Sequence, residues 1–144
     1  MISSELLEAY AKTEYHIDVL ASPILVYQRH TEVDNLLIEH DVEEWAYLTS
    51  FNPFSQLRSE AENLKSNLSL KNDLANYQTY SGSAIDPKGE WPNEDGFLAL
   101  GLSHLNANEL AQKYRQNAFL YGKLNQPTTL QLTKRGPRPP RFEK

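Results

Sequence analysis

Trp45-Ala46-Tyr47-Leu48 is an apolar run without alternation, and it leads directly into the polar segment Thr49-Ser50-Phe51-Asn52-Pro53-Phe54-Ser55. Four consecutive apolar residues are typical of a central strand that is covered on both faces. Proline has no backbone N–H, so the strand has to end at Asn52-Pro53. The stretch therefore predicts a buried strand with amide and hydroxyl side chains gathered at its end, which is where a rigid scaffold presents a site.

The segments around this strand predict an α+β fold. Ser59-Glu60-Ala61-Glu62 matches a capping box and predicts a helix over 59–76 whose buried stripe is Ala61, Leu64, Leu68 and Ala75. Other helices are predicted over 4–12, 32–40 and 106–114, and other strands over 13–20, 24–27, 77–85, 96–102, 118–121 and 129–132. In the first of these strands Tyr15, Ile17 and Val19 form the buried side. Hairpins alternate with helical crossovers, so we expect one mixed sheet of about six strands with three to four packed helices.

Length and composition predict one globular domain over 1–133, followed by a basic, Pro-rich tail over 134–144 that we expect to be disordered. The chain has no cysteine, no membrane-length apolar run and no secretory signal at its N-terminus, which together favour the cytoplasm. The net charge is −5, and because the tail carries +4 the body carries −9. An acidic body argues against nucleic acid as a partner and fits a basic protein partner.

Three polar clusters supply the candidate binding residues. In the first, Thr49, Asn52 and Ser55 offer hydroxyl and amide groups that suit a base edge or an amide. A turn in which Asn52 and Ser55 bond their own backbone explains the same residues equally well. Asn63, on the following helix, is either exposed or turned toward the same pocket.

The second cluster is acidic and contains Asp86 and Glu94, with Trp91 between them. Paired carboxylates can share acid–base chemistry, although Asp86-Pro87-Lys88-Gly89 is also an ordinary turn sequence. Trp91 is expected to plug the core, and a flat platform for a ligand is the alternative.

The third cluster is Arg115-Gln116-Asn117, which follows a predicted helix and precedes a strand. Asn117 is explained either as a left-handed helix cap or as an amide that faces the Asn52 turn together with Gln116. Glu14, His16 and Asp18 share one strand face that we expect to be solvated, and His30, His40 and His104 lack metal-ligand spacing, so no metal site is predicted. No P-loop, dinucleotide fingerprint or nucleophile motif indicates a cofactor or a reaction.

Three motifs, in order, resemble a bacterial family that is known as domain of unknown function number 3293. They are the segment 45–55, the segment Gly89-Glu90-Trp91-Pro92-Asn93-Glu94 with its continuation to Gly101, and Gln116-Asn117 with its continuation to Gly122. The resemblance spans roughly residues 4–133 and implies an architecture and candidate positions without an assigned activity. The chain departs from the family pattern at Arg115, where the pattern has Gly; the arginine either crowds a ligand or supplies a positive contact.

Two functions follow as expectations. The first is the binding of a small polar ligand or nucleotide at a pocket formed by the three clusters, with weak hydrolytic chemistry through Glu94 or Asp86 left open. The second is a protein-interaction module, such as an inhibitor, antitoxin or adaptor, in which the motifs only stabilise loops.

Overall fold

A computed structural model describes residues 3–134, so the predicted tail lies outside the described residues except for Lys134. The helices are α1 (Ser4–Lys12), α2 (Thr31–Glu39), α3 (Glu60–Asp73) and α4 (His104–Lys113), with a 3-10 turn at Pro53–Ser55. The strands are β1 (Glu14–Ile17), β2 (Ile24–Leu25), β3 (Glu44–Thr49), β4 (Gln78–Ile85), β5 (Glu94–Leu100), β6 (Ala118–Lys123) and β7 (Thr129–Leu132). The expected single α+β domain is confirmed.

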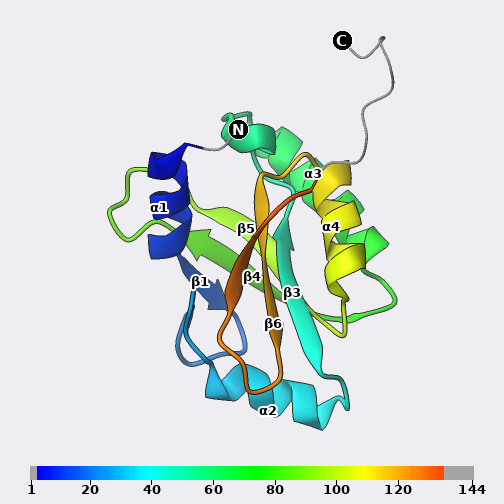
Figure 1. Ribbon diagram of the computed structural model, residues 1–144. Coiled ribbons are helices and arrows are strands. Elements are labelled where there is room, and N and C mark those ends of the chain that lie inside the picture. The colour runs from blue at the N-terminus through cyan, green and yellow to red at the C-terminus, as the bar shows by residue number, and fades with distance from the viewer. Residues whose placement is uncertain (1–2, 135–144) are drawn as a thin grey trace.

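These strands form one curled sheet in the order β2-β1-β4-β5-β3-β6-β7 (Figure 1). Every pairing among the described residues is antiparallel, whereas a mixed sheet had been expected, and the sheet has seven strands instead of about six. Each helical crossover skips an odd number of strands, so it joins two strands that run in the same direction but are not neighbours, and no parallel pairing arises. The predicted hairpins β1–β2 and β6–β7 are both present.

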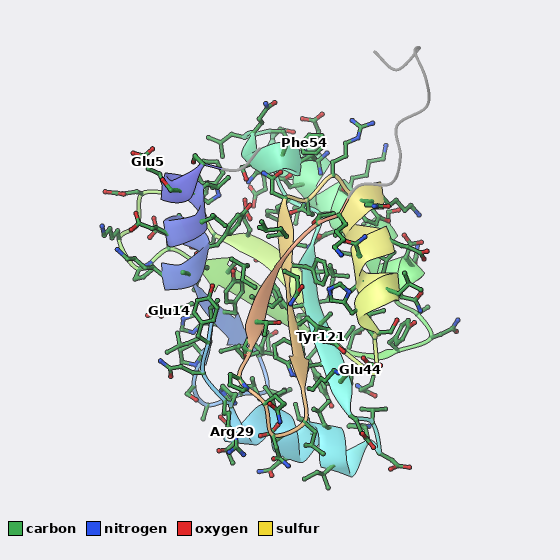
Figure 2. The ribbon with its side chains drawn as sticks, viewed as in Figure 1. Glu5, Glu14, Arg29, Glu44, Phe54 and Tyr121 are labelled. Carbon is green, nitrogen blue, oxygen red and sulfur yellow. The ribbon has the colours of Figure 1, made fainter. Side chains whose placement is uncertain are left out.

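The central strand β3 is covered on both faces, as its apolar run predicts. Ala46 and Leu48 face a core that is formed with α3 and α4, and these two helices lie side by side on that face (Figure 1). Trp45 and Tyr47 face a second core, formed with α2 and the β1–β2 hairpin. On neighbouring strands, Tyr121 of β6 donates a hydrogen bond to Glu44 of β3, and both lie near the middle of the view in Figure 2. Because β3 pairs with β5 and β6 and is covered on both faces, the polar groups at its Thr49 end are held by a rigid sheet.

The predicted buried stripe of α3 is wrong. Leu64 and Leu68 are 46% and 66% exposed, and Ala61 and Ala75 are exposed as well. The inward face carries Asn63, Asn67, Leu70 and Leu74 instead. The helix turns its asparagines inward because the turn after β3 has backbone groups that need hydrogen-bond partners. Asn67 Oδ1 accepts from the backbone N–H and the hydroxyl of Ser50, at 3.0 and 2.6 Å, and its Nδ2 donates to the Asp95 carbonyl.

Two smaller expectations are also corrected. β1 ends at Ile17, so Val19 lies in a turn and is 52% exposed, although it had been placed on the buried side. The fourth helix begins at His104 and not at 106, because the hydroxyl of Ser103 caps it by accepting from the Asn106 N–H.

Candidate functional site

The three polar clusters converge on one cavity of about 200 Å³. It lies between α1 and the sheet, on the side of the loop that joins β4 to β5 (Figure 1). Seven of the ten predicted site residues line it: Thr49, Asn52, Ser55, Asp86, Trp91, Glu94 and Gln116. Asn63, Arg115 and Asn117 are not among the lining residues, and the first and last of these support residues that are.

Asn52 is the junction between the turn and the acidic cluster. Its backbone is left-handed, with φ 47°, a conformation that asparagine tolerates better than most residues. Its Oδ1 accepts from Asn63 Nδ2 at 2.9 Å and from the Arg58 backbone N–H at 3.1 Å. Both of these partners are donors, so the other end of the amide, Nδ2, has to face Glu94. The turn hypothesis was therefore partly right: Asn52 organises the turn, but its side chain bonds α3, β5 and the backbone of Arg58 in the following loop, and not the backbone of the turn itself.

Glu94 is the acidic group that the site partly buries. Its Oε2 accepts two hydrogen bonds of 2.8 Å each, from Asn52 Nδ2 and from the indole N–H of Trp91. Burial raises the pKa of Glu94, and the hydrogen bonds from Asn52 and Trp91 offset part of that rise. Among residues 3–134 no donor reaches its other oxygen, Oε1.

Asp86 shapes the loop that carries Trp91. Its carboxylate accepts from the backbone N–H groups of Lys88, Glu90 and Trp91 at 3.0 to 3.1 Å. These hydrogen bonds, the one from Lys88 most of all, lower the pKa of Asp86. The ordinary-turn interpretation of this segment is thus correct. Trp91 is 36% exposed at the cavity, so the expected core plug is wrong. Its ring lines the site, where its one donor is committed to Glu94.

The third cluster closes the far side of the turn. Gln116 is buried, and its Nε2 donates to the carbonyls of Phe51 and Tyr114 at 3.0 and 3.2 Å. Asn117 Nδ2 donates to the hydroxyl of Ser55 at 3.1 Å. Both amides therefore face the Asn52 turn, as one of the two interpretations proposed. The left-handed residue here is Arg115, with φ 56°, and not Asn117.

Aromatic residues complete the cavity, and the sequence had not singled them out. Tyr10 of α1, Tyr15 of β1 and Tyr47 of β3 all line it. The Tyr10 hydroxyl lies 3.1 Å from the Ser55 hydroxyl and so ties α1 to the turn. Gly96 permits the position of Tyr47, because a Cβ at residue 96 would lie 2.7 Å from the Tyr47 hydroxyl. Alternation along the strands was the available signal, since Tyr47 and Thr49, and likewise Glu94 and Gly96, fall on one face.

The turn beside the cavity is strained. Asn52, Phe54 and Ser55 all have positive φ, between 47° and 60°, and none of them is glycine. The Phe54 N–H donates to the Arg115 carbonyl at 2.7 Å, which fastens this turn to Arg115, a further residue with positive φ. Figure 2 places Phe54 at the same end of the molecule as Glu5 at the start of α1. Such strain persists only where the surroundings hold it, and it concentrates at functional sites.

The family model described as protein of unknown function (DUF3293) matches residues 48–119. The chain belongs to this family. The matched region starts in β3 and ends in β6, so it contains all three polar clusters. No curated protein and no solved structure matches the chain. Arg115, where the resemblance drawn from the sequence has Gly, has a positive φ of 56°, a conformation in which glycine is unstrained.

Neither a metal cluster nor a membrane-spanning helix is found within residues 3–134. The imidazole of His16 contacts Glu14 at 2.9 Å, but no group of three or more His, Asp or Glu side chains in this range could hold a metal ion. No helix in the same range is long and apolar enough to cross a bilayer.

Proposed function

We propose that this protein binds a small polar molecule in the cavity between α1 and the sheet. The observation that carries the proposal is the state of Glu94, a partly buried carboxylate with two donors on Oε2 and none from residues 3–134 on Oε1. Taking a carboxylate out of water costs free energy. Because Oε1 has no donor from residues 3–134 and is not buried, it is open to a ligand that enters the cavity.

The walls of the cavity support the same proposal. Leu6, Ala84, Leu120 and Leu130 provide apolar surface, while the polar atoms are few and lie at the ends of strands. A mostly apolar cavity with a small number of convergent polar groups is the usual form of a small-molecule site.

The charge of the cavity favours a neutral or cationic ligand over an anionic one. Its lining residues include two acids, Asp86 and Glu94, and no Lys, Arg or His. A phosphate would meet repulsion there and no cationic partner. We therefore favour a nucleobase, nucleoside or other unphosphorylated molecule over a nucleotide, and nucleic acid is disfavoured as a partner for the same reason.

A thermal-shift screen tests the proposal. The purified protein is screened against nucleobases, nucleosides, amines, amides and nucleotides, because a ligand that binds only the native state raises the melting temperature. Glu94→Gln is run in parallel, with Glu90→Gln as the matched control, since Glu90 is exposed and undergoes the same chemical change. We expect a hit whose shift is lost in Glu94→Gln and kept in Glu90→Gln. If no compound raises the melting temperature of the folded protein, the proposal is wrong.

A second candidate function is supported by a different surface. Leu64 and Leu68 of α3 are exposed beside a groove of about 450 Å³, whose lining also includes Asp18, Asp95 and Lys71. Exposed leucines next to acids fit a protein partner with basic and apolar side chains. This function predicts a partner that is retained by the wild type and by Glu94→Gln and lost by the double variant Leu64→Ser/Leu68→Ser. Binding that survives the double variant would exclude this surface. The cytoplasmic location favoured by the absence of cysteine is part of either proposal.

A further inference from the structure

We propose that the ligand of this cavity is an organic cation, a protonated amine, amidine or guanidine with an apolar body, and that its N–H groups donate to Glu94. This inference rests on the proposed function and narrows it to one chemical class. It is carried by three independent observations: the free hydrogen-bonding atoms of the cavity, its charge and its aromatic walls.

Two oxygens at the cavity, Oε1 of Glu94 and Oε1 of Gln116, are acceptors without a donor from the described part of the chain. Glu94 has both donors on Oε2, which leaves Oε1 without a donor from residues 3–134. Gln116, which is only 7% exposed, uses Nε2 for the carbonyls of Phe51 and Tyr114. Its Oε1 receives no hydrogen bond from the same range of residues, although Gln116 lines the cavity. Because carbonyl oxygens can only accept, the amide of Gln116 cannot be reversed without losing both bonds. A ligand that satisfies these oxygens has to bring donors.

Most of the nearest donors are already committed elsewhere. Asn52 and Trp91 donate to Glu94, and Thr49 donates its hydroxyl to the Asp95 carbonyl at 2.5 Å. The hydroxyl of Ser55 accepts from Asn117 Nδ2 and shares one hydrogen bond with the hydroxyl of Tyr10, so one hydroxyl hydrogen of this pair stays available. The cavity therefore offers hydroxyl donors but no cationic one, and it is poorly equipped to hold a carboxylate or a phosphate.

The charge of the cavity selects for a positive ligand. Burial is the largest influence on the pKa of Glu94, and the two groups that offset it, Asn52 and Trp91, are both neutral. None of the salt bridges found among residues 3–134 includes Glu94. A cationic ligand would supply the counter-charge that Glu94 lacks. Because the carboxylate is partly buried, water would screen this attraction less than at the surface.

The walls suit the body of such a cation. Tyr10, Tyr15, Tyr47 and Trp91 line the cavity, and the faces of tyrosine and tryptophan rings attract cations through their quadrupole. Phe119 and the aliphatic side chains add apolar surface for the rest of the molecule. A rim of aromatic rings with one desolvated carboxylate is a chemistry that favours organic cations over inorganic ones, because the inorganic ions need more oxygen ligands.

Matched probes test the inference by isothermal titration calorimetry. Three pairs differ in charge and little in shape: benzamidine and benzamide, phenylguanidine and phenylurea, and tyramine and 4-hydroxyphenethyl alcohol. We expect at least one cation to bind about tenfold or more tightly than its neutral partner, as a charge-assisted hydrogen bond permits. The preference should disappear in Glu94→Gln and persist in Glu90→Gln. It should also weaken as the pH falls through the pKa of Glu94, although benzamidine stays protonated throughout.

The outcomes separate the inference from the proposed function. Equal affinity within every pair, or a preference that survives Glu94→Gln, overturns the cation assignment while the cavity remains a binding site. Failure of all six probes overturns it too, and the proposed function falls with it only when the wider screen of nucleobases and nucleosides is also flat. Circular dichroism of Glu94→Gln establishes that the variant is folded, and Glu94→Asp, which keeps the charge and shortens the side chain, should retain part of the preference.

Discussion

The amide of Asn52 donates through Nδ2 to Oε2 of Glu94 at 2.8 Å, and this bond joins the turn after β3 to the first residue of β5. The amide cannot turn around, because its Oδ1 is held by donors from Asn63 and Arg58. Asn52 is accordingly a positioning residue that fixes the carboxylate. Its substitution should disturb the fold and the site together, so Glu94 is the better probe of binding.

Asn52→Gly should lower the free energy of unfolding by about 1–3 kcal/mol, because the buried amide of Asn63 and the half-buried N–H of Arg58 lose their acceptor. Asn52→Ala should cost up to about 1 kcal/mol more, since the left-handed strain of alanine exceeds the extra chain entropy of glycine. Urea unfolding of the two variants measures both effects. Equal stability of the two variants would show that the backbone leaves the left-handed region when the side chain is removed.

Asn67→Ala should be destabilising by about 1–3 kcal/mol, because the Ser50 N–H and hydroxyl and the Asp95 carbonyl lose their partner. Leu68→Ala, one position along the same helix, should stay within about 0.5 kcal/mol of the wild type since Leu68 is exposed. Thermal and urea unfolding of the pair therefore report which face of α3 is inward. A larger loss for Leu68→Ala would mean that the leucine face is covered in solution.

Arg115→Gly should stabilise the protein by up to about 1 kcal/mol. The positive φ of 56° strains a residue that has a Cβ by about 1–2 kcal/mol, and glycine removes that strain. Part of the gain is lost because glycine has more conformational freedom in the unfolded chain. Arg115→Ala is the control, because it removes the charge and the long side chain but keeps the Cβ. If alanine stabilises as much as glycine, the effect belongs to the side chain and not to the backbone.

Glu94 should make stability depend on pH with a sign opposite to that of a salt-bridged acid. Burial raises its pKa in the folded state, so the folded protein binds more protons than the unfolded chain between the two pKa values. The contribution of Glu94 to stability is therefore greatest at low pH, below its unfolded pKa, and falls as the pH rises through the folded value. Melting temperatures of wild type and Glu94→Gln from pH 3 to 8 should diverge with rising pH, with the Gln variant relatively more stable. Parallel curves would contradict the desolvation of Glu94.

Trp91 should report on the cavity by fluorescence. Trp45 is 3% exposed and Trp91 is 36% exposed, so acrylamide should quench mainly Trp91, and Trp91→Phe should remove most of the quenching. A ligand that occupies the cavity should protect Trp91 from acrylamide in the wild type. Quenching that is unchanged in Trp91→Phe would mean that Trp45 is reached by solvent.

Much of the fold could be predicted because its signals are local. The apolar run 45–48 determines a strand covered on both faces, and the capping box at Ser59 starts α3, where the Ser59 hydroxyl and the Glu62 side chain bond as expected. The boundaries of α1 and the two hairpins also follow from patterns within a dozen residues. The inward face of α3 could not be predicted this way, because a helix that offers both leucines and asparagines is oriented by what it packs against.

The site divides along the same physical line. The sequence by itself determined which residues stand at strand ends, because side-chain periodicity and Pro53 are properties of short segments, and seven of the ten candidates do line the cavity. Only the tertiary structure decided that the three clusters meet and that Tyr10, Tyr15 and Tyr47 complete the walls. It also decided that Asn63 holds the side chain of Asn52 and that Asp86 holds the loop that carries Trp91. The reason is that these relationships join residues such as Asn52 and Glu94 across different strands. Such contacts arise when the sheet assembles and buries a carboxylate that in the sequence is one acid among many.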